Sequence, residues 1–258
     1  MEKQWTVGRQ TVVCAAETAA TYTKLVLTDG ELAHHARPGQ FLHIKCGENQ
    51  LRRPISIGGV EGDMLTILFE VKGKGTQWLS QRRPGDVLDV LGPLGHGFPV
   101  TEFDGKVLLV GGGIGVPPMH FAAQTLHRCD ALLAFRSADR VMLQKEFAAL
   151  CENVQIMSDD GSVGKQGFAA QGVKEMLSRC GYEAVFACGP RIMLKTVHQV
   201  CAAAGVTLYV SMEERMGCGI GACLGCSVPL QYPDGTRHMA RACADGPVFR
   251  SEEVIWDD

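Results

Sequence analysis

Four cysteines near the end of the chain constrain its fold more than any other feature. Cys218, Cys223 and Cys226 are separated by four and two residues, and Cys243 follows after sixteen more. Three thiols in one short loop and a fourth from a later segment match the plant-type [2Fe–2S] spacing, in which two bridged irons take two thiolates each. A loop wrapped around the cluster supplies three ligands, and a following hairpin returns the fourth. The spacing therefore predicts a [2Fe–2S] cluster.

A structural zinc site is the alternative for the same thiols. Zinc also takes four thiolates, but its sites are usually built from two short pairs of cysteines. Glycine is dense among the ligands, and its backbone freedom lets a loop curl tightly and aim N–H groups at sulfur; these residues are Gly217, Gly219, Gly221 and Gly225. The pattern favours iron–sulfur over zinc, and analysis of acid-labile sulfide would separate the two.

The remaining composition indicates a globular protein of the reducing cytoplasm. The chain has 258 residues, of which 46% are hydrophobic, and eleven cysteines. Residues 1–10 are polar and lack the apolar core of an export signal, which argues against a disulfide framework. The net charge of −3 gives no reason to expect nucleic acid, and the absence of 18 consecutive apolar residues predicts no membrane span. The seven other cysteines are expected to be mostly small buried hydrophobes: Cys14, Cys46, Cys129, Cys151, Cys180, Cys188 and Cys201.

Three successive sequence patterns along the chain predict three structural units. Short β-rich stretches without helices between them predict an antiparallel β-barrel over 1–101, which the motifs described below assign as a flavin-binding barrel; they cover 11–16, 24–28, 41–46, 55–60, 64–71 and 86–91. Alternating strands and helices over 102–211 predict an α/β nucleotide-binding domain with a parallel sheet; strands are expected at 106–112, 131–137, 154–159, 184–188 and 207–211, and helices at 117–129, 141–150, 168–180 and 191–204. Residues 212–258 predict a small C-terminal [2Fe–2S] subdomain.

Polar residues in the predicted barrel point to a flavin carrying phosphate. Arg53 lies at the start of a strand, where its charge can neutralise a phosphate, and Ser56 offers a hydroxyl to the flavin. Gly75 and Thr76 form a turn at a helix start, where free N–H groups favour anions. The Arg53 motif alone would be explained as well by an exposed arginine and a strand serine, so the later turn strengthens it.

Turns after two strands of the α/β domain predict a dinucleotide site. A glycine-rich turn containing Gly113 and Gly115 follows one strand and precedes a helix, although it is not a strict G-x-G-x-x-G fingerprint. Cys188, Gly189 and Pro190 end another strand, where they can face a nicotinamide. Ligands of open α/β sheets bind at these strand ends. A tight-packing turn is an almost equal alternative at both places.

Two acidic residues bear on the choice of nucleotide. Asp159 and Asp160 also follow a strand of the α/β domain. Their negative charge would repel a 2′-phosphate, which favours NAD over NADP.

The order of these motifs resembles that of the ferredoxin reductase superfamily: Arg-Pro-Ile-Ser, Gly-Thr, Gly-Gly-Gly-Ile-Gly-x-Pro-Pro and Cys-Gly-Pro. The run Met-Glu-Glu-Arg-Met-Gly-Cys-Gly-Ile-Gly-Ala-Cys-Leu-Gly-Cys begins at Met212, and Cys-Ala-Asp-Gly-Pro-Val-Phe begins at Cys243. With them the chain resembles a narrower family, the electron-transfer subunit of NAD-dependent (class 1B) dihydroorotate dehydrogenase. The match covers nearly the whole chain, and the cysteine run is its most specific part.

The resemblance implies FAD in the barrel, NAD as an exchangeable substrate on the α/β domain, and a partner subunit that carries FMN and oxidises dihydroorotate in pyrimidine synthesis. Two copies of each chain would form a heterotetramer. By position, the resemblance implies FAD contacts at Arg53, Pro54, Ile55, Ser56, Glu70, Val71, Lys72, Gly75 and Thr76, and cluster ligands at Cys218, Cys223, Cys226 and Cys243. The residues predicted from the strand ends to contact NAD are Gly113, Gly115, Cys188, Gly189 and Pro190.

Such a chain converts between two-electron and one-electron chemistry. A nicotinamide moves hydride, a cluster moves single electrons, and a flavin does both. In the implied complex, electrons from dihydroorotate reach the partner's FMN, cross the cluster to FAD and leave as hydride on NAD. This chain needs no general acid or base, so no residue of it is predicted to be catalytic.

Two other functions fit parts of the pattern. A stand-alone NAD(P)H reductase would feed ferredoxin or an oxygenase, but the apolar residues Ile220, Ala222 and Leu224 near the cluster favour a fixed protein interface. A regulatory module would use the cluster as a redox sensor, but no basic patch or DNA-reading motif supports it. Copurification with other subunits tests the first alternative, and NADH oxidation with an artificial acceptor tests the second.

Overall fold

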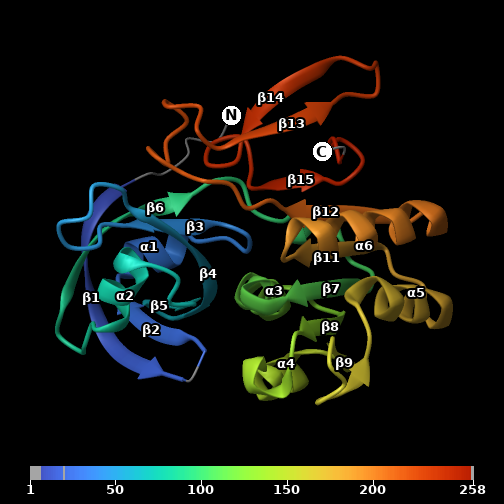
Figure 1. The fold of residues 1–258 in the computed structure, drawn as a ribbon, viewed down its shortest axis with the longest axis horizontal. Helices are drawn as coiled ribbons and strands as arrows, with labels where there is room; N and C mark the ends of the chain where they lie inside the picture. The colour runs from blue at the N-terminus through green and yellow to red at the C-terminus, as the bar shows by residue number, and fades with distance from the viewer. Residues whose placement is uncertain (1–6, 20, 257–258) are drawn as a thin grey trace.

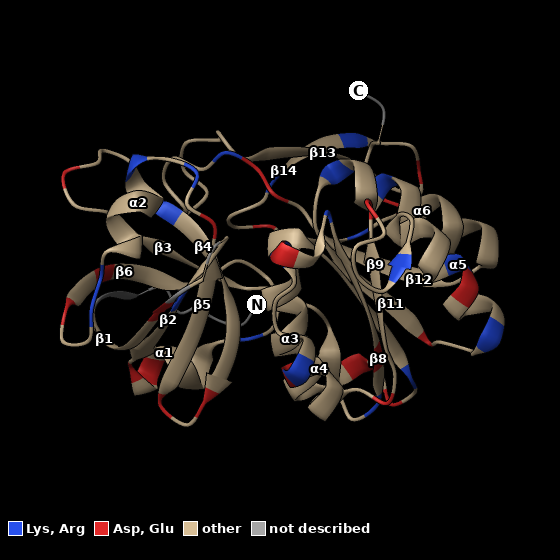
Figure 2. Ribbon diagram, turned by 60° about the horizontal axis from the view of Figure 1, so that its bottom comes forward, with Lys and Arg blue, Asp and Glu red and all other residues tan. Residues whose placement is uncertain are grey.

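The computed structural model describes residues 7–19 and 21–256. The first six residues, which belong to the stretch predicted to lack an export signal, lie outside the described residues. No helix in the described ranges is long and apolar enough to cross a membrane. Acidic and basic residues are both distributed over the two main units of the molecule (Figure 2).

The N-terminal unit is the predicted antiparallel barrel. Its strands close in the order β1-β2-β5-β4-β3-β6 (Figure 1). In β2, Thr23, Leu25 and Leu27 are buried while the residues between them are half-exposed, which is the period of two that a barrel wall requires. The strands are β1 (Val7–Thr18), β2 (Thr23–Thr28), β3 (Phe41–Ile44), β4 (Arg53–Glu61), β5 (Met64–Phe69) and β6 (Val87–Leu94).

Two short helices interrupt the barrel strands, so the expectation of strands without helices between them is wrong. Helix α1 (Gly30–His35) begins where the Asp29 carboxylate accepts a hydrogen bond of 3.1 Å from the Leu32 N–H. Helix α2 (Lys74–Ser80) follows β5. The predicted strand 64–71 ends at Phe69, which leaves Glu70 and the residues up to Gly73 in a loop before α2.

The second unit is the predicted α/β domain. Its sheet has the order β10-β9-β8-β7-β11-β12-β15, in which every pairing is parallel except that of β12 with β15. All six residues of β7 are buried, as expected for the central strand. The strands are β7 (Val107–Gly112), β8 (Cys129–Phe135), β9 (Val154–Ser158), β10 (Lys165–Gln166), β11 (Ala184–Cys188), β12 (Thr207–Ser211) and β15 (Val248–Arg250).

Helices cover both faces of this sheet. Helices α3 (Val116–Thr125) and α4 (Gln144–Leu150) pack on the face toward the barrel, and α5 (Ala169–Arg179) and α6 (Arg191–Ala204) pack on the other (Figure 1). Short 3₁₀ turns lie at Val100–Glu102, Gly113–Gly115 and Ala138–Arg140. Helix α3 joins the two units, because Gln124 Oε1 accepts a 3.1 Å hydrogen bond from Val60 N and His120 Nδ1 lies 2.8 Å from Gly58 O.

Two helix boundaries in the α/β domain differ from expectation. The helix predicted over 117–129 ends at Thr125, and Cys129 begins strand β8 instead. The chain turns extended at Leu126, whose N–H closes the helix on Ala122 O at 3.0 Å. The helix predicted from residue 141 begins at Gln144, after Leu143 has adopted a left-handed φ of 57°.

The C-terminal segment lies across both units. The hairpin of β13 (Ser227–Gln231) and β14 (Arg237–Arg241) precedes β15, which returns to the edge of the large sheet (Figure 1). Val228 and Phe249 share one hydrophobic core with Phe41 and Leu94 of the barrel. The segment after residue 211 is therefore packed into the other two units, and its predicted boundary at residue 212 stays a prediction.

Candidate redox centre and cofactor sites

The cluster loop directs backbone N–H groups at its sulfurs. Cys218 Sγ accepts hydrogen bonds of 3.4 Å from both Ile220 N and Cys223 N, and Cys243 Sγ accepts one of 3.1 Å from Gly221 N. Such donors stabilise negative charge on sulfur, as iron–sulfur ligands require. The donor set therefore fits a cluster held by thiolates.

The four thiols lie as two pairs. The Cys223 thiol contributes to lowering the pKa of Cys218, and the Cys226 thiol contributes to raising the pKa of Cys243, so each of these thiols lies near one other thiol. Among the residues that the structure describes, no three Cys, His, Asp or Glu side chains gather closely enough to hold one metal ion. Each iron of a [2Fe–2S] cluster takes two thiolates, so two pairs of thiols match this ligand set.

Ionisation differs between the two pairs. Burial opposes charge on Cys218, but the backbone N–H groups of Ile220 and Cys223 outweigh it and lower the pKa of this thiol to about 6. Burial and the Cys226 thiol raise the pKa of Cys243 to about 12, against the N–H of Gly221. Thiolate is the form that binds iron. Cys218 is therefore prepared as a ligand, whereas Cys243 loses its proton on metal binding.

The hairpin β13–β14 returns the fourth cysteine, as predicted. Ala242 N donates a 2.9 Å hydrogen bond to Cys226 O, which fixes the segment before Cys243 beside the loop. Arg241 donates through Nε and Nη2 to the two carboxylate oxygens of Asp245, both at 2.7 Å, and through Nη1 to Gly221 O at 3.1 Å. Sequence reasoning missed this clamp, although an Arg-x₃-Asp pair that flanks the last cysteine was visible.

Backbone conformation explains two glycines of the loop. Gly219 and Gly221 have φ values of 75° and 81°, which disfavour side chains. A Cβ on Gly219 would also lie 2.5 Å from His43 Nδ1. Leu224 has φ of 57° without being glycine and is 64% exposed. The loop thus presents a strained apolar residue to its surroundings, beside Ile220, which is 58% exposed.

The structure brings the two ends of the predicted FAD set together. Arg53 begins β4, and its guanidinium lies over the first turn of α2, where a Cβ on Gly75 would come within 2.5 Å of Arg53 Nε. Thr76 Oγ1 accepts hydrogen bonds from Lys72 N at 2.9 Å and Gly73 N at 3.2 Å, and so shapes the loop before the helix. The guanidinium of Arg53 above the first turn of α2 offers several cationic N–H donors, an arrangement that is suited to binding a phosphate.

Other residues of that set have different surroundings. Ile55 is buried in the barrel core, so only its backbone is available to a ligand. Glu70 pairs with Lys72 at 3.0 Å and with Arg140 at 3.6 Å, which ties this loop to the α/β domain. Val71 is 49% exposed. FAD contacts at these positions remain a prediction.

The residues of the predicted NAD set converge at the ends of β7 and β11. Cys188 is paired with Gly111 across these strands, and a Cβ on Gly115 would lie 2.2 Å from Cys188 O. A Cβ on Gly189 would approach Gly112 Cα at 3.1 Å. Strand order reverses between β7 and β11, which is where open α/β sheets bind ligands. Burial raises the pKa of the Cys188 thiol to about 12, so the thiol stays protonated.

Comparison with known proteins places this architecture in a family. Residues 213–255 match the model of the iron–sulfur cluster binding domain of dihydroorotate dehydrogenase B. The chain is 40% identical to the protein of Geobacillus thermodenitrificans named dihydroorotate dehydrogenase B (NAD(+)), electron transfer subunit, over 96% of this chain and 98% of that protein. The chain belongs to this family. The protein of the same name from Caldanaerobacter subterraneus subsp. tengcongensis is also 40% identical, over 85% of this chain and 87% of that protein.

A solved structure shares the whole arrangement. It is the NADH-dependent reduced ferredoxin-NADP oxidoreductase structure studied for flavin-based electron bifurcation. Its TM-score is 0.86 and its identity 28%, over 97% of this chain and 91% of that chain. The chain thus has a ferredoxin reductase-like fold with a C-terminal iron–sulfur domain, as the sequence predicted, and the iron–sulfur interpretation prevails over zinc.

The acidic residues predicted to favour NAD over NADP lie two strands away from β7, which leads into the glycine turn. Asp159 and Asp160 follow β9, whereas β8, which neighbours β7, ends before the exposed Arg136. Asp160 also accepts hydrogen bonds from Ser162 N and Oγ, at 2.9 and 2.6 Å. Hydrogen bonds from Ser162 lower the pKa of Asp160 and keep it charged. The charge argument for NAD is therefore weaker than the sequence indicated.

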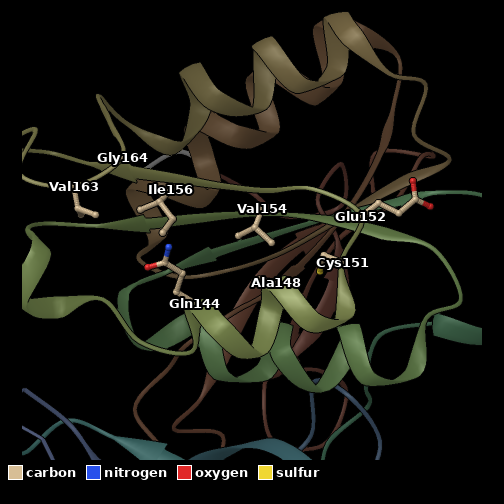
Figure 3. A pocket seen from close by; sticks show the side chains of 8 residues that line it. All are labelled: Gln144, Ala148, Cys151, Glu152, Val154, Ile156, Val163 and Gly164. Carbon is tan, nitrogen blue, oxygen red and sulfur yellow. The ribbon is translucent and has the colours of Figure 1, made fainter.

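A groove between α4 and β9 is separate from these sites (Figure 3). It lies on an outer part of the sheet rather than at the ends of β7 and β11, and it contains none of the predicted cofactor residues. Its lining consists of Gln144, Ala148, Cys151, Glu152, Val154, Ile156, Val163 and Gly164. It is not a candidate for the flavin or the nucleotide.

Sequence reasoning also missed His43. It lies on β3, is fully buried and faces the cluster loop at Gly219. Burial, helped by the charge of Arg52, lowers the pKa of His43 to about 4, so the ring is neutral at pH 7. A lone histidine in a strand carries no spacing signal, and only the fold places it beside the loop.

Proposed function

We propose that this chain passes electrons between a dihydroorotate-oxidising partner subunit and NAD⁺, through a [2Fe–2S] cluster and FAD, in pyrimidine synthesis in the cytoplasm. The partner would carry FMN, in a heterotetramer of two copies of each chain. Family membership supports the partner and the electron acceptor, because relatives 40% identical are named dihydroorotate dehydrogenase B (NAD(+)), electron transfer subunit.

The observation that carries the proposal is the packing of the cluster loop on the flavin strands. Gly219 lies against His43 of β3, and His43 is the cross-strand neighbour of Pro54 in β4, one residue from Arg53. The proposed cluster site and the proposed flavin site would therefore adjoin at His43. A flavin in such a place exchanges single electrons on one side and hydride on the other.

The residues of this chain bind and orient rather than react. Cys218, Cys223, Cys226 and Cys243 would hold the cluster, with N–H donors of the loop stabilising their charge. Arg53 and the start of α2 would hold the flavin phosphates, and the turn at Gly113–Gly115 would hold the nucleotide against Cys188. Thiol protonation at Cys188 excludes it as a nucleophile at neutral pH.

Exposed apolar residues of the loop suit a permanent partner. Ile220 is 58% and Leu224 is 64% exposed, and both lie between cluster cysteines. Apolar side chains at the core of an interface are more typical of stable complexes than of charge-steered encounters. A partner seated there would approach the cluster directly and keep water from it.

Reconstitution with the catalytic subunit tests the proposal. The chain and an FMN-containing dihydroorotate dehydrogenase encoded with it would be coexpressed and purified through a tag on one of them. We expect a stable complex that reduces NAD⁺ with dihydroorotate, while the catalytic subunit alone does not use NAD⁺. A chain that remains monomeric and leaves NAD⁺ unreduced would contradict the proposal.

A second function has one observation in its favour. The similarity to the NADH-dependent reduced ferredoxin-NADP oxidoreductase structure extends over 97% of this chain. An electron-transfer subunit of another NAD(P)H-linked complex, or a stand-alone reductase, would share this fold. Rapid reduction of a soluble ferredoxin by NADH without any partner, together with no dihydroorotate-dependent activity, would favour it.

A further inference from the structure

His43 is a buried side chain without good hydrogen bonds. It is 0% exposed, and neither Nδ1 nor Nε2 has a partner of acceptable geometry in the described part of the chain. Nearly all buried side-chain nitrogens in native proteins are hydrogen-bonded, so an exception indicates a functional reason. Replacement by an apolar residue would remove the desolvation cost, yet a histidine is present.

The ring lies between the two redox sites. On the barrel side His43 is paired with Pro54 of β4, and the backbone carbonyl of His43 accepts a 3.3 Å hydrogen bond from Arg52 Nη1. On the other side the ring faces the cluster loop, where its Nδ1 lies 2.5 Å from the place of a Cβ on Gly219. Only a glycine at residue 219 leaves room for the imidazole.

We propose that His43 is a positioning residue that couples the cluster loop to the flavin site, an inference that rests on the proposed function. In the cluster-bound protein, one of its two unpartnered ring nitrogens would donate to the Cys218–Gly219 backbone, which the ring already approaches at Gly219, and so hold this backbone against β3, beside the strand that begins with Arg53. Ordering of β3 and β4 by bound flavin then orders the loop, and cluster assembly orders the flavin strands in return. Such coupling is reciprocal by thermodynamic necessity.

Cluster loss measured with and without FAD tests the coupling. Reconstituted full-length protein, FAD-bound or FAD-free, would be challenged with an iron chelator under anaerobic conditions, and the decay of the cluster absorption recorded. In the natural protein we expect FAD to slow the loss about fivefold or more. In His43→Leu the ratio of the two rates should fall to about one, and in His43→Gln, which keeps an N–H donor, it should be partly restored.

The ratio of the rates of cluster loss without and with FAD separates coupling between the two sites from simple destabilisation of the protein. A merely structural defect would accelerate cluster loss equally in both states and leave the ratio unchanged, so an unchanged ratio in His43→Leu would overturn the proposal. His198→Leu is the matched control, because His198 is a partly buried histidine of α6 bonded to Ser251 Oγ at 3.0 Å, and its ratio should equal that of the natural protein. If His43→Leu assembles no cluster, the His43→Gln variant decides between the two outcomes. A cluster that assembles in His43→Gln and is protected by FAD supports the role of the N–H donor. Failure of His43→Gln to assemble a cluster overturns the proposal. A protein that binds neither cofactor contradicts the proposed function instead.

A second and independent observation is a pair of thiols outside the redox centre. Cys129 begins β8 and Cys151 follows α4, and their sulfurs lie 3.5 Å apart. Glu152 N donates a 3.0 Å hydrogen bond to Cys129 O, which holds the two backbones together. Cys151 is half-buried and lines the groove between α4 and β9 (Figure 3), whereas Cys129 is 1% exposed.

We propose that this pair is a thiol–disulfide exchange site for low-molecular-weight disulfides. The Cys151 sulfur attacks the disulfide from the groove, forms a mixed disulfide and releases one small thiol. The Cys129 sulfur then displaces the second small thiol, so two protein thiols and one disulfide become one protein disulfide and two small thiols. The proton of each attacking thiol passes to the small thiolate that leaves, so both steps balance. The hydrogen bond with Cys129 and burial raise the pKa of the Cys151 thiol, so the first attack is expected to be the slower step.

Peptide mapping tests this exchange. The cluster-loaded protein would be treated with oxidised glutathione, its free thiols blocked with iodoacetamide, and the protein digested with trypsin. We expect a disulfide-linked peptide that joins residues 129–136 to residues 146–165, in the natural protein and in the control Cys180→Ser. In Cys129→Ser, Cys151 should instead be trapped as the glutathione adduct. No linked peptide in the natural protein, or the adduct at Cys151 there as well, would overturn the proposal.

Discussion

Gly115 touches Cys188 so closely that no side chain fits between them. A Cβ on Gly115 would lie 2.2 Å from Cys188 O and 2.7 Å from Gly189 N, and both are backbone atoms that cannot rotate away. The contact joins the turn after β7 to the end of β11, across the point where strand order reverses. The proposed nucleotide site therefore depends on glycine at residue 115 for its shape.

Gly115→Ala is expected to impair nucleotide binding. Overpacking against backbone costs about 1–3 kcal/mol, and the two strand ends must separate to relieve it. We expect the KM for NADH, measured with ferricyanide as acceptor, to rise by roughly tenfold, since small misplacements in a binding site have large effects. Gly181→Ala is the control, because a Cβ there meets nothing within 4 Å. An unchanged KM and melting temperature in Gly115→Ala would contradict the assignment.

Arg53→Ala is expected to weaken FAD retention. Removing a charge-assisted contact of about 1.5–3 kcal/mol should raise the Kd for FAD by roughly 10- to 100-fold. Titration of cofactor-free protein with FAD, followed by flavin fluorescence, measures the change. Arg83→Ala removes an exposed arginine of the same barrel and should leave the Kd unchanged. Equal affinities in the two variants would show that the Arg53 motif is misassigned.

Cys223→Ser is expected to lose the cluster while FAD remains bound. Cys223 supplies both a thiol to the pair with Cys218 and the N–H that donates to Cys218 Sγ, and serine preserves only the N–H. Iron and acid-labile sulfide per chain should fall by more than half, and coupled NAD⁺ reduction should stop. Cys180→Ser should retain both. A full complement of iron, sulfide and coupled activity in Cys223→Ser would remove this residue from the ligand set.

The fold was largely predictable because periodicity and glycine turns mark its elements. The helix at 191–204 and the strands at 184–188 and 207–211 have the predicted bounds, since Pro190 and Gly205 interrupt the pattern. The helix predicted over 117–129 was too long because the apolar residue Cys129 fits the helical pattern, although it begins β8. The return of β15 to the large sheet could not be predicted, because a strand of three residues is too short to show an alternation of apolar and polar residues.

The parts of the candidate site whose residues are close together in the sequence were predictable, and the parts whose residues come from distant segments were missed. The cysteine spacing and the Arg53 motif are contiguous patterns. His43 acts on the cluster loop from a strand far away in sequence, so nothing near it in the sequence indicates its role, whereas Arg241 lies two residues before Cys243 and contacts Gly221 only through the fold. The proximity of the flavin and cluster sites likewise follows from packing between segments about 170 residues apart, such as His43 and Gly219.

Lys106→Met is expected to destabilise the α/β domain in a pH-dependent way. Lys106 Nζ lies 2.8 Å from Asp130, whose side chain is 2% exposed, and 2.9 Å from Glu152. Burial opposes ionisation of Asp130, but hydrogen bonds from Lys106, Tyr182 and Asn153 outweigh it and lower its pKa. Removing one partner of a buried pair leaves an uncompensated charge and costs about 3 kcal/mol at pH 7.

The sign of the pH dependence follows from the lowered pKa of Asp130. The ionised carboxylate stabilises the natural protein above the unfolded pKa of about 3.9, and this contribution is lost as pH falls through the lower folded value. In Lys106→Met the unpaired carboxyl becomes easier to protonate, so the difference in urea midpoint between the two proteins should be largest at pH 7 and narrow below about pH 4. Lys165→Met, which breaks the exposed pair with Glu175, should shift the midpoint little at either pH. A difference that is constant with pH would show that Lys106 stabilises the domain through packing of its stem and not through its charge.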